Sequence, residues 1–151
     1  MALDKHILKN TDKETIVSIA GANDTVTISL ADLVTANQRL GATGATGPTV
    51  NVATVITSGD VNSSMTIRRG ATGATGHLVF AGAPENAPTV QFNQYGFTES
   101  AQNTQNILVT HSGATGAQVT SFIVLRKIDG YNSTIETAEY SIYDDVTKVG
   151  E

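Results

Sequence analysis

Three histidines are the first residues to test for chemistry, because imidazole nitrogens serve as metal ligands and as general acids or bases. His6, His77 and His111 lie in three different segments of the chain. No two of them have the short spacing that is typical of a helical or cross-turn metal site. We therefore expect each to be a surface or half-buried polar residue, and the spacing predicts no metal centre.

The carboxylates make an equally weak case for a catalytic or calcium site. Asp144 and Asp145 are adjacent, but the further oxygens and the central glycine of a calcium loop are missing around them. Glu136 and Glu139 are close in sequence and have no evident opposing acid or base. The sequence also lacks the Gly-x-Ser-x-Gly, Gly-x-Gly-x-x-Gly and Gly-x4-Gly-Lys-Ser/Thr patterns of hydrolases, dinucleotide sites and phosphate loops.

The chain contains no cysteine, which removes a further group of functions. Disulfide bonds, thiolate zinc sites and cysteine nucleophiles are all excluded. Together with the missing catalytic patterns, this predicts a protein that is not an enzyme and that uses no metal or cofactor. The absence of thiols also fits synthesis in a reducing cytoplasm.

The charge distribution argues against nucleic-acid and membrane partners. The net charge is −5, and basic residues are adjacent only at Arg68-Arg69 and Arg126-Lys127. Both pairs lie in strand-like runs, where we expect surface charges or ion pairs rather than a basic binding face. The N-terminus does not resemble a secretory signal, and no segment approaches the roughly 20 apolar residues of a membrane span. The sequence therefore predicts no direct nucleic-acid partner and no membrane partner.

One low-complexity phrase occurs three times. Gly-Ala-Thr triplets begin at Gly41, Gly70 and Gly113, with glycine at every third position. A collagen triple helix needs many such triplets and abundant proline, and only Pro48 falls within these phrases. The phrases are therefore interpreted as glycine-rich turns between strands, or as segments that meet where symmetry-related copies come together.

Alternation of apolar and polar residues predicts β-strands along most of the chain. The runs 14–20 and 24–30 are separated by Gly-Ala-Asn-Asp, a turn composition, so we expect them to pair as a hairpin. The segment 29–40 is expected to form one or two helical turns with Ser29 as the N-cap. Further strand-like runs cover residues 49–59, 63–69, 77–82, 88–97, 105–113 and 118–128.

Short strands at regular spacing, without long helices between them, indicate an all-β protein. We predict an antiparallel β-sandwich or jelly-roll-like single domain with extended terminal arms. The domain is expected to span residues 14–131, with an N-terminal arm at 1–13 and a C-terminal arm at 132–151. The C-terminal arm is too apolar and aromatic for a solvated tail, and we expect it to pack on this subunit or on a neighbour.

Several local phrases resemble small virion structural proteins of marine tailed phages, cyanophages in particular. The phrases that carry this resemblance are HILKNTDKETIVSIAG (6–21), TISLADLV (27–34), MTIRRG (65–70), VLRKIDGY (124–131) and ETAEYSIYDD (136–145). They cover roughly half of the chain, none is a catalytic motif, and the Gly-Ala-Thr phrases fall where the resembling proteins have short turns.

The resemblance implies a non-enzymatic head decoration or cement protein on the outer surface of the capsid. Its implied partners are the major capsid protein and further copies of itself, after synthesis in the host cytoplasm. Placement in the tail or neck, or a glycan-binding adhesion module with exposed aromatics, are the alternatives. The expected subunit or capsid contacts lie in the two arms, at Ile7, Leu8, Ile135, Tyr140, Ile142 and Tyr143.

Overall fold

A computed structural model of the chain describes residues 3–41, 48–70, 76–92 and 104–133. Strands dominate these residues, and the helical structure within them is limited to two short 3-10 helices, η1 (Leu30–Leu33) and η3 (Pro84–Asn86). The strands are β1 (Asp4–Asn10), β2 (Glu14–Ala20), β3 (Asp24–Ile28), β4 (Gln38–Leu40), β5 (Thr49–Gly59), β6 (Ser64–Arg69), β7 (His77–Gly82), β8 (Thr89–Gln91), β9 (Ile107–Ser112), β10 (Val119–Asp129) and β11 (Tyr131–Ser133).

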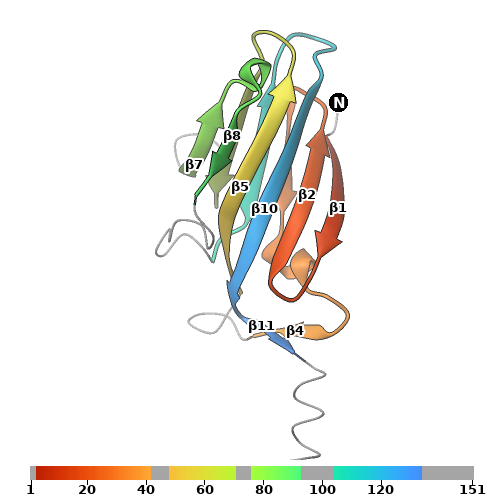
Figure 1. Ribbon diagram of the computed structural model, residues 1–151, viewed down its shortest axis with the longest axis vertical. Helices are drawn as coiled ribbons and strands as arrows, with labels where there is room; N and C mark the ends of the chain where they lie inside the picture. Colours follow the sequence, from red (N-terminus) through yellow and green to blue (C-terminus); the bar gives the residue numbers. More distant parts are fainter. Residues whose placement is uncertain (1–2, 42–47, 71–75, 93–103, 134–151) are drawn as a thin grey trace, which may run out of the picture.

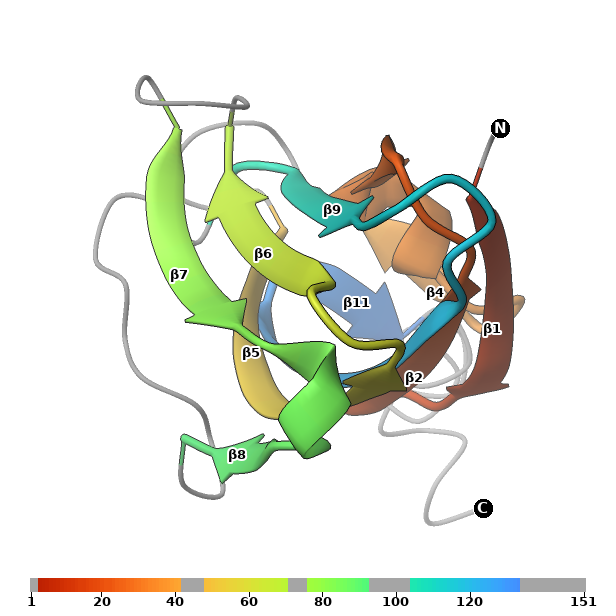
Figure 2. The same ribbon diagram turned by 90° about the horizontal axis from the view of Figure 1, so that it is seen from above.

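The strands form two main sheets that face each other, as Figures 1 and 2 show. The five-stranded sheet has the order β1-β2-β10-β5-β8, and the four-stranded sheet has the order β3-β9-β6-β7. The antiparallel pairs β2–β10, β3–β9, β5–β8 and β6–β7 are nested in the sequence and alternate between the sheets. This is the pairing of a jelly roll, so the predicted all-β, antiparallel sandwich is confirmed.

The core lies between the two sheets and follows from the two-residue period of the strands. Alternate residues of β2, β6, β9 and β10 are buried, and those between them face outward. The buried apolar cluster comprises Leu3, Val17, Ile19, Ile28, Leu30, Leu33, Val50, Val52, Val55, Met65, Ile67, Ile107, Val109, Ile123 and Leu125.

The expected hairpin between residues 14–20 and 24–30 is wrong. β2 pairs with β1 and β10, whereas β3 pairs with β9 in the other sheet. The turn between them crosses from one sheet to the other, with positive φ at Gly21 (118°) and Asn23 (60°). The Gly21 N–H donates to Val119 O at 2.9 Å, which ties the crossing to the start of β10. Turn composition marks a change of direction, but it does not determine which strand becomes the partner.

The expected arm at 1–13 lies largely within the sandwich. Residues Asp4–Asn10 form β1, the edge strand of the five-stranded sheet, and the register with β2 shifts between Ile7 and Lys9. Near the other end of the chain, β11 pairs with β4 and continues directly from β10. Residues 134–151, most of the expected C-terminal arm, lie outside the described residues.

The segment 29–40 contains one helical turn, the 3-10 helix η1, followed by the short strand β4. Ser29 is the N-cap residue of η1, but its side chain makes no capping hydrogen bond. Leu30 and Leu33 are buried in the core, so burial of these two leucines replaces capping as the source of stability. Of the expected strand 88–97, residues Thr89–Gln91 form β8, and residues 93–97 lie outside the described residues.

The flanks of the Gly-Ala-Thr phrases lie at opposite ends of the sandwich. The end at which β9 leads into β10 is called the β9–β10 end, and the end at which β10 leads into β11 is called the β10–β11 end. The first two phrases are flanked by the start of β5 and the end of β6, which lie at the β10–β11 end. Gly113 and Gly116 of the third phrase lie at the β9–β10 end. Gly70 has a φ of 85°, a left-handed backbone conformation that favours glycine over residues with a Cβ atom.

Candidate functional site

A buried chain of hydrogen bonds joins the two sheets at the β9–β10 end. His111 on β9 has Nδ1 2.9 Å from Gly21 O and Nε2 2.7 Å from Ser121 Oγ on β10. Because a carbonyl oxygen can only accept, Nδ1 carries a hydrogen, and Nε2 of the neutral ring accepts from the Ser121 hydroxyl. The Thr57 hydroxyl on β5 lies 3.0 Å from Ser121 Oγ and 3.1 Å from Thr120 O. We call His111, Ser121 and Thr57 the histidine cluster.

The Ser121–His111 contact has the distance of a nucleophile and its general base, but its surroundings differ from those of a catalytic pair. Both side chains are fully buried, and the third group that orients the imidazole is a backbone carbonyl rather than a carboxylate. Burial lowers the pKa of His111 from its usual 6.5, opposed by the hydrogen bond to Gly21. The arrangement therefore holds a neutral imidazole away from solvent, and its hydrogen bonds connect the two sheets.

A second polar cluster occupies the β10–β11 end and is built around Lys127 on β10. Its Nζ donates to Asn10 Oδ1 at 2.9 Å, to Thr11 O at 2.8 Å and to Gln38 Oε1 at 3.0 Å. The same Nζ lies 4.9 Å from the centroid of the Tyr131 ring. Burial lowers the pKa of Lys127 to about 8, opposed by the charge of Asp12. All three ammonium hydrogens are used, so Lys127 ties the β1–β2 turn and β4 to β10.

Arg69 on β6 belongs to the same end of the molecule and is fully buried. Its Nη1 donates to Val50 O on β5 at 2.8 Å, and Nη2 donates to Gln105 O at 2.8 Å. Tyr131 donates from its hydroxyl to Leu30 O at 2.6 Å. Burial raises the pKa of Tyr131, and the nearby charge of Arg69 opposes that rise. We call Lys127, Arg69 and Tyr131 with their hydrogen-bond partners the cationic cluster.

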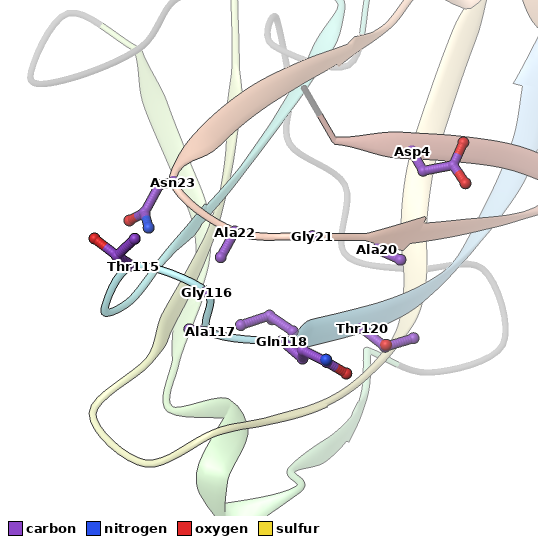
Figure 3. A pocket seen from close by; sticks show the side chains of 11 residues that line it. Asp4, Ala20, Gly21, Ala22, Asn23, Thr115, Gly116, Ala117, Gln118 and Thr120 are labelled. Atoms are coloured by element: carbon purple, nitrogen blue, oxygen red, sulfur yellow. The ribbon is translucent and has the colours of Figure 1, made fainter. Parts of the chain in front are cut away.

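An open recess of about 770 Å³ lies at the β9–β10 end, between the β2–β3 turn and the loop that contains the third Gly-Ala-Thr phrase (Figure 3). Its volume falls in the range of small-molecule sites. Small residues such as Ala20 and Ala22 form much of the lining, with Asp4, Gln118 and Thr120 adding polar groups. Asn23 is occupied within the protein, because its side chain accepts from Gly113 N and donates to Ala114 O. The lining contains no aromatic side chain among the described residues.

The outer face of the five-stranded sheet carries exposed apolar side chains. Phe122 on β10 is 37% exposed and Ile56 on β5 is 40% exposed, and the register places them directly opposite each other. Val124 follows Phe122 on the same face, and Ile16 on β2 is its register partner. An apolar strip therefore runs across three strands of this face.

The predicted contact residues are only partly covered by the structure. Ile7 and Leu8 lie on β1, where they are 43% and 57% exposed. Ile135, Tyr140, Ile142 and Tyr143 lie outside the described residues. The contacts proposed for all six stay predictions.

Three charged or titratable residues are placed differently from the expectation. His111 is fully buried rather than surface or half-buried, and Arg69 and Lys127 are buried rather than surface charges. The reason is the two-residue period of the strands, which turns one member of each basic pair inward. His6 and His77 are exposed, as expected.

Comparisons with known proteins identify no family for this chain. No protein-family model, no curated protein and no solved structure matches it. Among residues 3–41, 48–70, 76–92 and 104–133, no group of three or more His, Asp or Glu side chains could hold a metal ion. No helix in that part of the chain is long and apolar enough to cross a membrane.

Proposed function

We propose that the protein is a non-enzymatic structural component of a virion, a head decoration protein that binds the outer surface of the capsid. The strongest support is the burial of the side chains that could otherwise take part in catalysis or ligand binding. Four such residues are buried, and their polar groups form hydrogen bonds within the fold: His111, Ser121, Arg69 and Lys127. The described part of the molecule would therefore act through binding surfaces on its exterior. Jelly rolls recur among capsid and lectin domains, which bind partners in this way.

The edge strand β1 is the surface that would meet the capsid. It pairs with β2 on one side, and its other backbone side has no strand partner within the described residues. Ile7 and Leu8 project from it with large exposed fractions. An extended segment of the capsid protein can add to such an edge and bury these two side chains. Many copies on one shell add avidity, so each single contact can be modest.

Quantitative mass spectrometry of purified virions from the encoding phage tests this proposal. A decoration protein is expected at high copy number, in fixed ratio to the major capsid protein, and gold-labelled antibodies should mark the head. Labelling of the tail or neck would move the protein to that part of the particle. Absence of the chain from purified virions would rule the proposal out.

The recess at the β9–β10 end supports a second candidate, a glycan-binding module. Its volume suits a small sugar, and the Asp4 carboxylate and the Gln118 amide are groups that bind sugar hydroxyls. A glycan-binding module would use exposed aromatic rings, whereas Tyr131 is half-buried and donates a hydrogen bond to Leu30 O. A glycan array decides this: binding that is lost on Ala22→Trp, which fills the recess, supports the module, and an array without signal excludes it.

A further inference from the structure

The outer face of the five-stranded sheet is ordered in three cross-strand rows that the register defines. The middle row is His6, Ser18, Phe122, Ile56 and Thr89. The row toward the β9–β10 end is Asp4, Ala20, Thr120 and Ser58. The row toward the β10–β11 end is Lys9, Ile16, Val124, Thr54 and Gln91.

Within these three rows charge is confined to one margin, and the next row toward the β10–β11 end carries Glu14 and Arg126. Across β2, β10, β5 and β8 the three rows hold only apolar and uncharged polar side chains, and Asp4, His6 and Lys9 all stand on the edge strand β1. In a chain with a net charge of −5, the three rows are thus uncharged beyond the edge strand, and Phe122 lies near their middle. Loss of charge around a central aromatic residue is typical of the core of a protein–protein interface.

The three rows of one copy are complementary in size and charge to the same rows of a second, antiparallel copy. The row toward the β9–β10 end has small side chains at Ala20 and Ser58, where the opposite row carries the larger Ile16 and Thr54. Thr120 and Val124, which occupy the β10 positions of the two rows, are similar in size. On the edge strand, the first of these rows holds Asp4 and the second holds Lys9. When a second copy is related by a two-fold axis along the middle row, the small Ala20 faces the larger Ile16 of the other copy. The same rotation places Asp4 opposite the other copy's Lys9.

We propose that this face binds the same face of a second copy, in an antiparallel two-fold dimer whose axis runs along the middle row. Phe122 then meets the partner's Phe122, and Ile56 meets the partner's Ile56, near the axis. Ile16 fills the space over the partner's Ala20, and Val124 packs on the partner's Thr120. Two sheets that pack face to face in this way keep their strands within about 30° of each other.

The charged margin favours the antiparallel orientation over the parallel one. Asp4 now contacts His6 (Oδ2 to Nε2, 3.0 Å), and Lys9 contacts Glu14 (Nζ to Oε1, 2.9 Å), both in exposed positions. Exposed ion pairs of this kind are weak, so exchanging them for Asp4–Lys9 contacts between copies has little cost. Rotation about an axis parallel to the strands would instead place the charged β1 over the uncharged β8. The dimer does not rest on the proposed virion role, because it is argued from the outer face of the sheet, whereas that role uses the unpaired backbone side of β1 with Ile7 and Leu8.

Sedimentation velocity over a concentration series tests the dimer directly. The wild-type protein is expected to dimerise at micromolar concentration, and Phe122→Glu should raise the dissociation constant at least about tenfold, because two carboxylates then meet on the axis. Leu78→Glu is the matched control, since Leu78 is 45% exposed on the other sheet, and it should leave the dimer intact. A wild-type monomer or trimer would overturn the proposal, as would equal effects of the two variants.

A charge exchange tests the orientation without touching the apolar centre. Asp4→Lys and Lys9→Asp should each weaken the dimer, because like charges then face each other across the interface. The double variant Asp4→Lys/Lys9→Asp should restore wild-type association. Failure of the double variant to recover would contradict the antiparallel arrangement. Circular dichroism of every variant checks that the β-structure is retained.

Cross-linking provides a readout that does not depend on a destabilising substitution. The chain has no cysteine, so Phe122→Cys introduces a single thiol that lies on the proposed axis. A short bis-maleimide should join two copies of this variant efficiently and should join copies of Leu78→Cys only at a background level. Equal yields from the two variants would show that some other surface holds the copies together.

Discussion

The histidine cluster and the cationic cluster sit at opposite ends of one core and join the same two sheets by different electrostatics. In the first, burial keeps the imidazole of His111 neutral, and hydroxyl groups complete its hydrogen bonds. In the second, Arg69 and Lys127 carry their charges inside the protein and direct them at carbonyl and amide oxygens. A neutral cluster costs little desolvation, whereas a buried cation must be surrounded by acceptors before burial is tolerable.

The difference predicts unequal sensitivity to substitution. Removing a hydroxyl from the histidine cluster leaves one neutral group without a partner, and such a loss costs about 1–3 kcal/mol. Removing a buried cation leaves several oriented carbonyl groups facing apolar space, and the cost rises with their number. The β10–β11 end should therefore be the more fragile of the two.

Arg69→Met is expected to have the largest effect. It removes the donors to Val50 O and Gln105 O while keeping most of the side-chain volume. We expect the free energy of unfolding to fall by about 3–5 kcal/mol, measured by urea denaturation. Arg68→Met is the neighbouring control: Arg68 is half-buried and donates to Gly76 O at 3.2 Å, so a loss below about 1 kcal/mol is expected. Similar losses in both variants would show that burial of Arg69 has no special role.

Lys127→Met should be the next most severe change and should alter the response to alkaline pH. It removes the donor to Thr11 O and Gln38 Oε1, and we expect a loss of about 2–4 kcal/mol near neutral pH. The folded protein releases the Lys127 proton near pH 8, and the unfolded chain releases it near 10.5. Between these values unfolding takes up a proton, so this group makes the free energy of unfolding rise with pH.

The measurement is the difference between wild type and Lys127→Met from about pH 8 to about pH 9.5. The gap should widen as pH rises, because the methionine variant has no proton to release. Tyr131 has a raised pKa, so it acts in the opposite sense above pH 10, which is why the range stops short of that value. A gap that stays constant across the range would contradict the lowered pKa of Lys127.

Ser121→Ala probes the histidine cluster and should have a smaller effect. His111 Nε2 and the Thr57 hydroxyl would each lose a contact, and a loss of about 1–3 kcal/mol is expected. Thr120→Ala, one residue earlier on the outer face, should cost less than about 1 kcal/mol. If the two variants lose the same amount, the buried hydroxyl does not hold the sheets together.

The strands that carry the two clusters could be predicted from the sequence, but which strands pair with one another could not. Residues 14–20 were expected as a strand and form β2 at the same bounds, because local alternation records which side chains face the core. β2 pairs with its sequence neighbour β1 and with β10, about a hundred residues later, and no local pattern encodes the second choice. The next strand along the chain, β3, is the partner that the turn composition predicts, and it lies in the opposite sheet.

The polar clusters were missed although a signal for them exists. Arg69 follows Met65 and Ile67 at two-residue spacing, Lys127 follows Ile123 and Leu125, and His111 follows Ile107 and Val109. Extending each apolar series by one step places all three side chains inside. The expectation of surface charge rested on residue type alone, and the oxygens that make burial possible come from distant segments that the sequence does not connect.

The smallest expected effect is the response of the histidine cluster to acid. A protonated His111 would donate from Nε2 to Ser121 Oγ, the Ser121 hydroxyl would turn to Thr57, and the Thr57 hydroxyl would donate to Thr120 O. The hydrogen bonds survive protonation, so burial alone opposes the charge. Because the pKa of His111 is lowered from 6.5, the unfolded chain takes up this proton first, and the free energy of unfolding falls as pH drops below that value.

Urea denaturation at about pH 7 and about pH 5.5 measures this response, with His111→Gln as the reference that cannot titrate. The wild type should lose up to about 1.4 kcal/mol more than the variant for each pH unit between the two pKa values of His111. Equal losses would mean that the imidazole is protonated as readily inside the core as in water. The histidine cluster would then differ from the cationic cluster in its charge at neutral pH, but burial of His111 would not make the free energy of unfolding depend on pH.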